Sequence, residues 1–289
     1  MRLVSYLDGG VERLGVVANG RVISAESLMT GGPRTMDDLL ADGQGTLARL
    51  RLATDAKWSS IGTSLADVKR LPPVPRPGKI VAVGLNYRDH AAEGGRKAPA
   101  DPVLFAKFPS ALVGPGAEIT WDPKLTSAVD YEAELAVVIG RAARRVSEAD
   151  ALDHVLGYTC LNDVSARDLQ YADKQFVRSK SLDTFCPMGP ALITADEIED
   201  PQTLRVRSFV NGDVRQDAST AEMIHSVAAL VAFCSRAFTL EPGDVIATGT
   251  PAGVGWYREP KEMLKDGDEV VIEIDGIGRL VNTCREADR

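Results

Sequence analysis

The sequence of 289 residues has little of what several classes of protein require. Its four cysteines, Cys160, Cys186, Cys234 and Cys284, are far apart, and no two of them form a Cys-x-x-Cys pair. Neither a zinc site nor a disulfide framework is therefore expected. A chain with so few, widely spaced cysteines is most simply placed in a reducing compartment, the cytoplasm.

Long apolar runs and an excess of positive charge are also missing. No run approaches the roughly 18–20 residues that cross a membrane, and the N-terminus is too polar for the apolar core of a signal peptide. Acidic residues number 41 against 33 lysines and arginines, which gives a net charge of −8. Nonspecific binding to nucleic acid and docking on anionic lipid both need a basic surface. We therefore expect neither nucleic acid nor a membrane as a partner.

The composition is that of an ordinary globular protein, with 44% hydrophobic and 26% charged residues. The length suggests about two domains. Residues 71–78 contain four prolines and one glycine, which is typical of a semi-rigid linker. We therefore predict a small N-terminal domain at residues 1–71 and a main domain at residues 72–289.

Most of the predicted elements are strands. In the N-terminal domain, strands near residues 3–8 and 14–17 precede Asn19-Gly20, a strong hairpin signal, and Thr35 can cap a short helix over 36–41. This domain is therefore predicted to be α+β. In the main domain, apolar spacing predicts one long helix over 220–238. Strands and helices do not alternate regularly, which argues against a doubly wound parallel sheet. Strands are predicted at 79–83, 135–139, 157–161, 204–210, 245–247, 270–274 and 278–281.

Two carboxylates stand at the start of the apolar strand that ends at Ile139. Glu132 and Glu134 are two residues apart, so they share one face of the strand, with their carboxylates about 6–7 Å apart. Like charges at that distance cost about 2–3 kcal/mol at an effective dielectric constant of about 20. A bound hard cation removes this cost, and oxygen ligands suit magnesium, manganese or calcium.

Asp163 follows another apolar strand and is a candidate third ligand. The sequence leaves an alternative open at this point. Glu132 and Glu134 could form a solvated edge, or be braced by arginines, while Asp163 caps a helix over residues 164–169.

His90 and Glu93 are three residues apart, so they can touch on one helical turn. A carboxylate beside an imidazole raises its basicity and fixes its tautomer, as a general base requires. The alternative is a surface turn with an incidental pair. Lys180 could neutralise an anionic group of a substrate near a metal, or be an ordinary solvated lysine. The turn at 248–250, Thr-Gly-Thr, could offer a hydroxyl and N–H groups to an anion, or be an ordinary turn.

Six segments, taken in order, resemble the fumarylacetoacetate hydrolase family, and the resemblance covers roughly residues 79–281. Each segment alone is weak, but six in the right order are highly specific. They are VGLNY at 83–87 with His90 and Glu93, YEAEL at 131–135, NDVSARDLQ at 162–170, KSLDTF at 180–185, PMGP at 187–190 and GDVIATGTP at 243–251.

The resemblance implies a mixed, mostly β fold, with a β-sandwich or β-roll around the metal, and a homodimer. It implies that Glu132, Glu134 and Asp163 bind Mg²⁺ or Mn²⁺, with Ca²⁺ as a possible substitute in crystals. By the same match, His90 and Glu93 activate water and Lys180 stabilises negative charge that develops on the substrate. The residues expected to contact the substrate are Tyr87, Arg167, Gln170 and Thr250.

The implied substrate is a small 2-oxo acid. The reaction that we predict is hydrolysis of a C–C bond in an acylpyruvate or related 2,4-diketo acid, which yields pyruvate and a carboxylic acid. A lyase, decarboxylase or isomerase could use the same enolate, for example in decarboxylation of oxaloacetate or isomerisation of 2-hydroxyhepta-2,4-diene-1,7-dioate. A non-catalytic metal- or ligand-binding protein is a further alternative, but the presence of His90, Glu93 and Lys180 beside the acidic residues argues against it.

Overall fold

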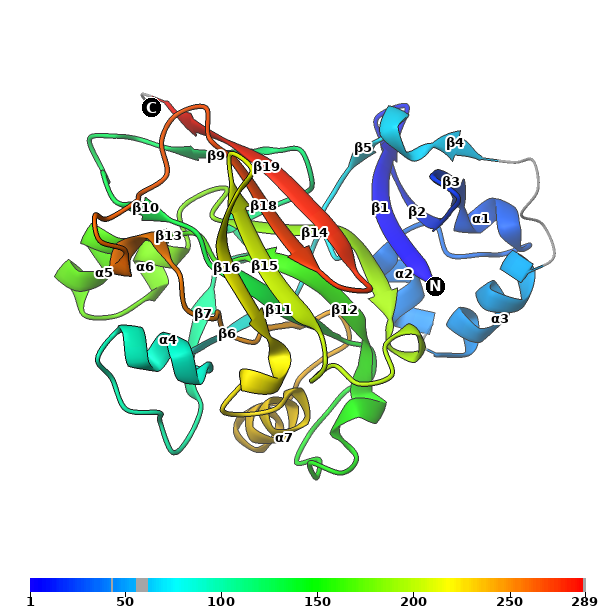
Figure 1. Cartoon of the computed structure of the whole chain (residues 1–289). Helices are drawn as coiled ribbons and strands as arrows, with labels where there is room; N and C mark the ends of the chain where they lie inside the picture. The colour runs from blue at the N-terminus through cyan, green and yellow to red at the C-terminus, as the bar shows by residue number, and fades with distance from the viewer. Residues whose placement is uncertain (43, 56–61, 288–289) are drawn as a thin grey trace.

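The computed structural model describes residues 1–42, 44–55 and 62–287, and strands dominate them as predicted. One large sheet runs through both predicted domains (Figure 1). Its strand order is β4 (Thr63–Ser64), β3 (Arg21–Ser24), β2 (Val11–Ala18), β1 (Arg2–Asp8), β14 (Cys186–Thr194), β12 (Val155–Asn162), β11 (Ala133–Ile139), β17 (Val245–Ala247), β6 (Ile80–Gly84) and β7 (Val103–Lys107). Two short strands join it at the sides, β5 (Lys69–Arg70) beside β1 and β8 (Leu112–Val113) beside β14.

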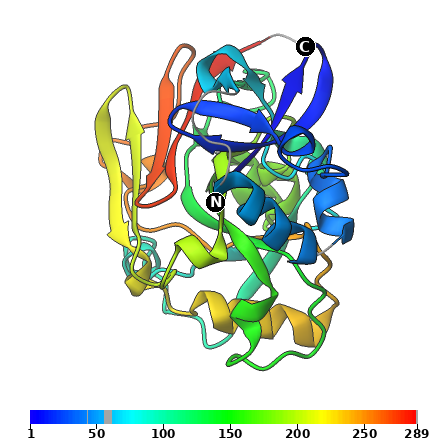
Figure 2. The same cartoon turned by 90° about the vertical axis from the view of Figure 1, so that its right-hand side faces the viewer.

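A second sheet packs against the first and completes a β-sandwich. Its strands β15, β18 and β19 contact β11, β12 and β14 of the large sheet, and Figure 2 shows these hairpins standing beside it. The second sheet has the order β16 (Asp213–Ser219), β15 (Arg205–Val210), β18 (Glu269–Ile274), β19 (Gly278–Glu286) and β9 (Glu118–Trp121). A separate two-stranded pair is formed by β10 (Val129–Asp130) and β13 (Ser165–Ala166).

The helices are short and lie around the sheets (Figure 1). They are α1 (Ala25–Leu28), α2 (Met36–Asp42), α3 (Gln44–Asp55), α4 (Arg88–Glu93), α5 (Arg167–Asp173), α6 (Val177–Lys180) and α7 (Val227–Ala237). No helix in these described ranges is long and apolar enough to cross a membrane. All four cysteines are buried free thiols.

The N-terminal strands continue the main sheet. The predicted hairpin forms at Asn19 and Gly20, whose φ angles of 50° and 71° are those that such a two-residue turn requires. The backbone N–H of Asp38 donates to Thr35 Oγ1 at 3.2 Å, so Thr35 caps α2 as predicted. Strand β1 pairs with β14, with Leu3 opposite Leu192. The first 71 residues and the remainder therefore share one sheet.

Strand β11 is buried on both faces, which explains its continuous apolar run. Leu135 and Val137 belong to the core between the two sheets. Ala136 and Val138 belong to the second core, which also contains side chains of the N-terminal helices. Because side chains alternate along a strand, Glu134 shares its face with Ala136 and Val138. The strand therefore carries a carboxylate into the interior of the protein.

The predicted helix over 220–238 is wrong at its start. Helix α7 begins after Ser226, whose hydroxyl accepts from the N–H of Ala229 at 3.1 Å. The two residues before the cap bond elsewhere: the N–H of Ile224 donates to the carbonyl of Asn86, and that of His225 donates to the Asn86 side chain. These contacts with the loop after β6 hold the segment out of the helix.

Candidate metal centre and active site

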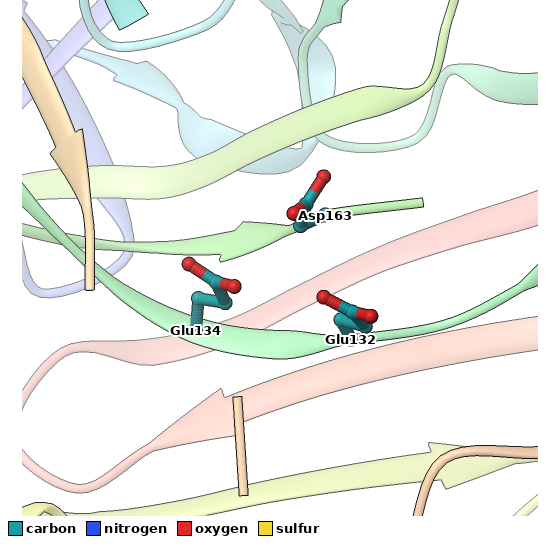
Figure 3. Close-up of side chains that lie close together, drawn as sticks. All are labelled: Glu132, Glu134 and Asp163. Carbon is teal, nitrogen blue, oxygen red and sulfur yellow. The ribbon is translucent and has the colours of Figure 1, made fainter. Parts of the chain in front are cut away.

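Three carboxylates converge where the neighbouring strands β11 and β12 meet (Figure 3). Glu134 lies in β11, Glu132 precedes that strand by one residue, and Asp163 follows the end of β12. The N–H of Asp163 donates to the carbonyl of Glu132 at 2.9 Å, which fixes the two backbones side by side. One oxygen of each carboxylate lies within 4.8 Å of the other two. This is closer than the 6–7 Å expected for neighbours on one strand face.

Burial excludes the alternative of a solvated acidic edge. The exposed fractions of Glu132, Glu134 and Asp163 are 5%, 1% and 0%. Asp163 does not cap a helix either, because α5 begins at Arg167 and has Ala166 in the capping position. Carboxylates in such a position need partners of opposite charge.

Two cationic side chains meet Glu132. Lys180 Nζ lies 2.8 Å from its Oε2, and Arg167 Nη1 lies 2.7 Å from its Oε1. Burial alone would raise the pKa of Glu132, but Lys180 and Arg167 outweigh it and lower the pKa to about 2. Lys180 also lies 2.7 Å from Asp163 Oδ2 and is almost fully buried, so the alternative of a solvated lysine is wrong.

Glu134 has a different environment. Its Oε2 accepts the backbone N–H of Gly249 at 2.9 Å, which is the contact that the Thr-Gly-Thr turn makes with an anion. Burial, together with the charges of Asp163 and Glu132, raises the pKa of Glu134 well above its ordinary value. A cation within reach of all three carboxylates would remove this repulsion. The all-oxygen donor set fits Mg²⁺ or Mn²⁺.

The His90–Glu93 contact forms as predicted, within α4. His90 Nδ1 lies 2.7 Å from Glu93 Oε1, and Glu93 Oε2 accepts the N–H of Gly253 at 2.9 Å. His90 is buried, so the alternative of a surface turn is wrong. The carboxylate favours a proton on Nδ1 and leaves Nε2 as the basic nitrogen. Among the described residues, no group hydrogen-bonds to Nε2.

Arg167 is held by a buried network that includes Asp130. Its Nε donates to Asp130 Oδ2 at 2.9 Å, and its Nη1 donates to Gln170 Oε1 at 3.0 Å. Its buried Nη2 has no hydrogen-bond partner within the described ranges. Since an unpaired buried donor is costly, this nitrogen is suited to receive an anionic oxygen of a ligand.

These groups surround a small cavity of about 40 Å³, and most of the predicted site residues reach it. Its lining includes His90, Glu132, Arg167, Gln170, Lys180 and Thr250, together with Arg96 and Tyr257. Glu132, one of the three carboxylates, and the imidazole of His90 therefore line one common space.

Two residues predicted to bind substrate, Thr250 and Tyr87, differ in their contacts. The Thr250 hydroxyl donates to the carbonyl of Ala133 at 3.0 Å and accepts from Gln216 at 2.7 Å. Tyr87 is completely buried, and its hydroxyl has no hydrogen-bond partner in the part of the chain that the structure describes. Burial and the nearby Glu134 carboxylate raise the pKa of Tyr87. Contact of these two residues with a substrate stays a prediction.

Sequence reasoning missed two buried charged residues of this site, Lys107 and Asp130. Lys107 Nζ lies 2.6 Å from Asp163 Oδ1. Asp130 accepts the N–H groups of Gly255 and Trp256 in addition to Arg167. The sequence held one signal for Lys107. It lies two residues after Phe105, so the two side chains share one face of a strand.

Oxygen ligands buried beside a basic histidine are characteristic of metal-dependent enzymes that act on small anionic substrates. Residues 79–285 match the family model described as fumarylacetoacetate (FAA) hydrolase, C-terminal. The chain belongs to this family of enzymes. The predictions of the family, of the mostly β fold and of a site for Mg²⁺ or Mn²⁺ are thereby confirmed.

Three similar proteins extend over most of this chain. The oxaloacetate tautomerase YisK of Bacillus subtilis (strain 168) is 45% identical over 261 residues, which cover 86% of each chain. The human mitochondrial oxaloacetate tautomerase FAHD2A is 43% identical over 288 residues, covering 98% of this chain and 91% of that protein. The crystal structure of maleylpyruvate hydrolase from Sphingobium sp. SYK-6, with manganese(II) and pyruvate, has a TM-score of 0.81, 35% identity and complete coverage of both chains.

Proposed function

We propose that this protein catalyses the keto–enol tautomerisation of oxaloacetate. The observation that carries the proposal is the buried His90–Glu93 pair, whose imidazole lines the same cavity as Glu132, Arg167 and Lys180. Tautomerisation requires a base beside an anionic 2-oxo acid and groups that stabilise an enolate. The two oxaloacetate tautomerases at 45% and 43% identity support this choice over the C–C hydrolysis that the sequence favoured.

Binding of the substrate would use the cationic groups of the cavity. The unpaired Nη2 of Arg167 is a donor for a substrate carboxylate, while Nε and Nη1 hold the guanidinium in place through Asp130 and Gln170. Lys180, on the same cavity, supplies a second positive charge. The dianion of oxaloacetate matches two such cations.

His90 would act as the base. Its Nε2 takes a proton from C3 of oxaloacetate, the electron pair of that C–H bond becomes the C2=C3 double bond, and the keto oxygen gains the negative charge. Protonation of that oxygen gives the enol, and the reverse sequence gives the keto form. Glu93 compensates the positive charge on the imidazole, because its Oε1 lies 2.7 Å from Nδ1.

A Mg²⁺ or Mn²⁺ ion held by Glu132, Glu134 and Asp163 would supply a Lewis acid that polarises the keto group of the substrate. Lys180, which contacts Glu132 and Asp163 in the structure, stands where it can share the charge of the enolate oxygen. Tyr257, whose ring lies edge-on 6.0 Å from that of His90, would shield the base from water.

A second candidate function is the hydrolysis of acylpyruvates to pyruvate and a carboxylic acid. The maleylpyruvate hydrolase at 35% identity supports it, and the same His90–Glu93 pair could take a proton from water instead of from C3. Water would then attack the distal carbonyl, and the bond between that carbon and the pyruvate methylene would break. The pyruvate enolate would leave and take up a proton.

One assay of products separates the two functions. Protein with Mn²⁺ is mixed with freshly dissolved enol oxaloacetate. The ultraviolet absorbance of the enol, the release of pyruvate and the release of carbon dioxide are measured in the same reaction. We expect faster loss of the enol, no release of pyruvate, and loss of the effect with a chelator. A rate equal to that of Mn²⁺ alone would refute the tautomerase. Release of pyruvate from acylpyruvates would identify the protein as a hydrolase. Release of carbon dioxide from oxaloacetate would identify it as a decarboxylase.

The homodimer is part of this proposal. Strand β7 lies at the end of the strand order, so one of its edges pairs with no other strand among the described residues. Val103 and Phe108, at the start and just beyond the end of that strand, are both substantially exposed for apolar residues. An exposed strand edge with apolar neighbours favours pairing with a second copy. Analytical ultracentrifugation tests this, with a single monomer peak as the contrary result.

A further inference from the structure

Lys107 is buried at the metal centre although the proposed reaction gives it no role. It is the last residue of β7, and its side chain is inaccessible to solvent. Its Nζ lies 2.6 Å from Asp163 Oδ1. It also donates to the carbonyl of Lys180 and, at 3.5 Å, to that of Val164. Lys107 is therefore tied both to a carboxylate and to the backbone on two sides of the site.

Lys180 is held in a different way. Its Nζ donates to Glu132 Oε2 and Asp163 Oδ2, both carboxylates of the candidate metal site. A cation bound by these carboxylates competes with Lys180 for their oxygens. The same cation does not take the backbone carbonyls that hold Lys107. Metal binding would therefore release Lys180 and leave Lys107 in place.

The charges support the same division. Glu132, Glu134 and Asp163 carry three negative charges when ionised. A divalent cation and Lys107 together carry three positive charges. Arg167 contacts both Glu132 and Asp130, and the charge of Asp130 balances its own. With Lys107 present, the loaded centre is neutral without Lys180. Without Lys107, one carboxylate would keep Lys180 as its counter-ion, because an unpaired buried charge is strongly unfavourable.

We propose that Lys107 is a positioning residue, the fixed counter-ion of Asp163 that frees Lys180 to contact the substrate. This proposal rests on the proposed function in one respect, that Lys180 contacts the keto oxygen of the substrate, which becomes negative in the enolate. Lys107 also orients Asp163, because it holds Oδ1, so that Oδ2, which accepts from Lys180 in the structure, would become open to the cation once Lys180 is released. Second-sphere contacts of this kind commonly change metal-site properties by about 10–100-fold.

Oxalate binding to the manganese-loaded protein tests the proposal, since oxalate imitates the enolate of a 2-oxo acid. Lys107→Met keeps the length of the side chain and removes its charge, whereas Lys107→Arg keeps the charge. Lys79→Met is the control. Lys79 precedes β6 and pairs at 2.6 Å with the buried Asp244, which precedes β17, and it does not line the site cavity. Calorimetry gives the Mn²⁺ affinity first and the oxalate affinity at saturating Mn²⁺ second.

We expect Lys107→Met to bind oxalate at least about tenfold more weakly at saturating Mn²⁺, Lys107→Arg to recover most of that loss, and Lys79→Met to bind as the unchanged protein does. A purely structural role would lower the melting temperature without changing oxalate affinity, and that result would overturn the proposal. Lys107→Gln is the second uncharged variant should Lys107→Met not fold. Failure of the tautomerase function is separate, because it would leave oxalate binding by the unchanged protein intact.

Discussion

Arg167 Nε lies 2.9 Å from Oδ2 of Asp130, and both side chains are buried. Asp130 also accepts the backbone N–H groups of Gly255 and Trp256 at 2.8 Å and 3.0 Å. One carboxylate therefore connects the guanidinium that faces the cavity to the segment that carries Tyr257. The orientation of Arg167 therefore depends on Asp130, a residue that does not itself line the cavity.

Asp130→Asn should destabilise the protein by about 3–5 kcal/mol, because removal of one partner leaves the other charge buried and unpaired. Chemical denaturation measures this loss. The surviving folded protein should also bind oxalate more weakly, since Arg167 is no longer held. Asp217→Asn is the control, because its ion pair with Arg205 is exposed, and it should change neither property appreciably. Equal stability of Asp130→Asn and the unchanged protein would contradict the assigned role.

His90→Gln should lower the rate of tautomerisation by about 10²–10⁴-fold, which is the usual contribution of a general base. Mn²⁺ affinity should stay unchanged, because His90 is not among the carboxylate ligands. Glu93→Gln should lower the rate by a smaller factor, since the imidazole remains. The matched control is His154→Gln, which removes an equally buried histidine that contacts Arg141 instead of the site. A full rate in His90→Gln would show that another group is the base.

Binding of Mn²⁺ should strengthen as the pH rises. Burial and the charges of Asp163 and Glu132 raise the pKa of Glu134 in the folded, metal-free protein above the ordinary value of 4.5. The metal-free protein therefore loses stability as the pH rises from that ordinary value towards the raised pKa. The metal binds the ionised carboxylate of Glu134. Its binding therefore offsets this loss of stability and releases a proton.

Thermal unfolding with and without Mn²⁺ measures the effect. The increase in melting temperature caused by the metal should grow between about pH 5 and about pH 8. Glu134→Gln removes the titrating ligand, so its increase should be smaller and should no longer depend on pH in this way. A metal-induced increase that falls with rising pH would contradict the assignment of Glu134.

Removal of residues 1–71 should make the remaining chain unstable or insoluble. Strand β1 hydrogen-bonds to β14, and Leu3 is completely buried. The truncation would expose an edge of β14 together with apolar side chains that the N-terminal helices cover. Soluble yield and melting temperature measure the result. A stable, active protein beginning at residue 72 would show instead that the two predicted domains are independent.

Local patterns predicted the parts of the site that lie close together in the chain. Glu132 and Glu134 share a strand face because side chains alternate along a strand. His90 and Glu93 meet because residues three apart are neighbours on a helical turn. Asn19 and Gly20 form the predicted hairpin because they accept the backbone angles that it needs. Each of these depends on a few consecutive residues.

Contacts between distant segments were beyond such patterns. Helix α7 begins at Val227 because Asn86, far away in the sequence, takes the backbone N–H of His225. In the sequence, Asp130 looks like any acidic residue at a strand end. Its role becomes visible only in the structure, where the N–H groups of Gly255 and Trp256 donate to it. The spacing of Lys107 two residues after Phe105 could suggest that it is buried. It could not identify its partner, because Asp163 follows a different strand.

By itself, the sequence determined that the candidate ligands are carboxylates, that His90 and Glu93 form a pair, and to which family the chain belongs. Each of these follows from a spacing within one strand, within one helical turn, or within one ordered set of motifs. Only the tertiary structure decided that the three carboxylates are buried within 4.8 Å of one another. It alone also decided that Lys107, Lys180 and Arg167 pair with Asp163 and Glu132. The reason is physical. Charge compensation in a buried site is set by distances across paired strands, and these distances exist only after the sheet has formed.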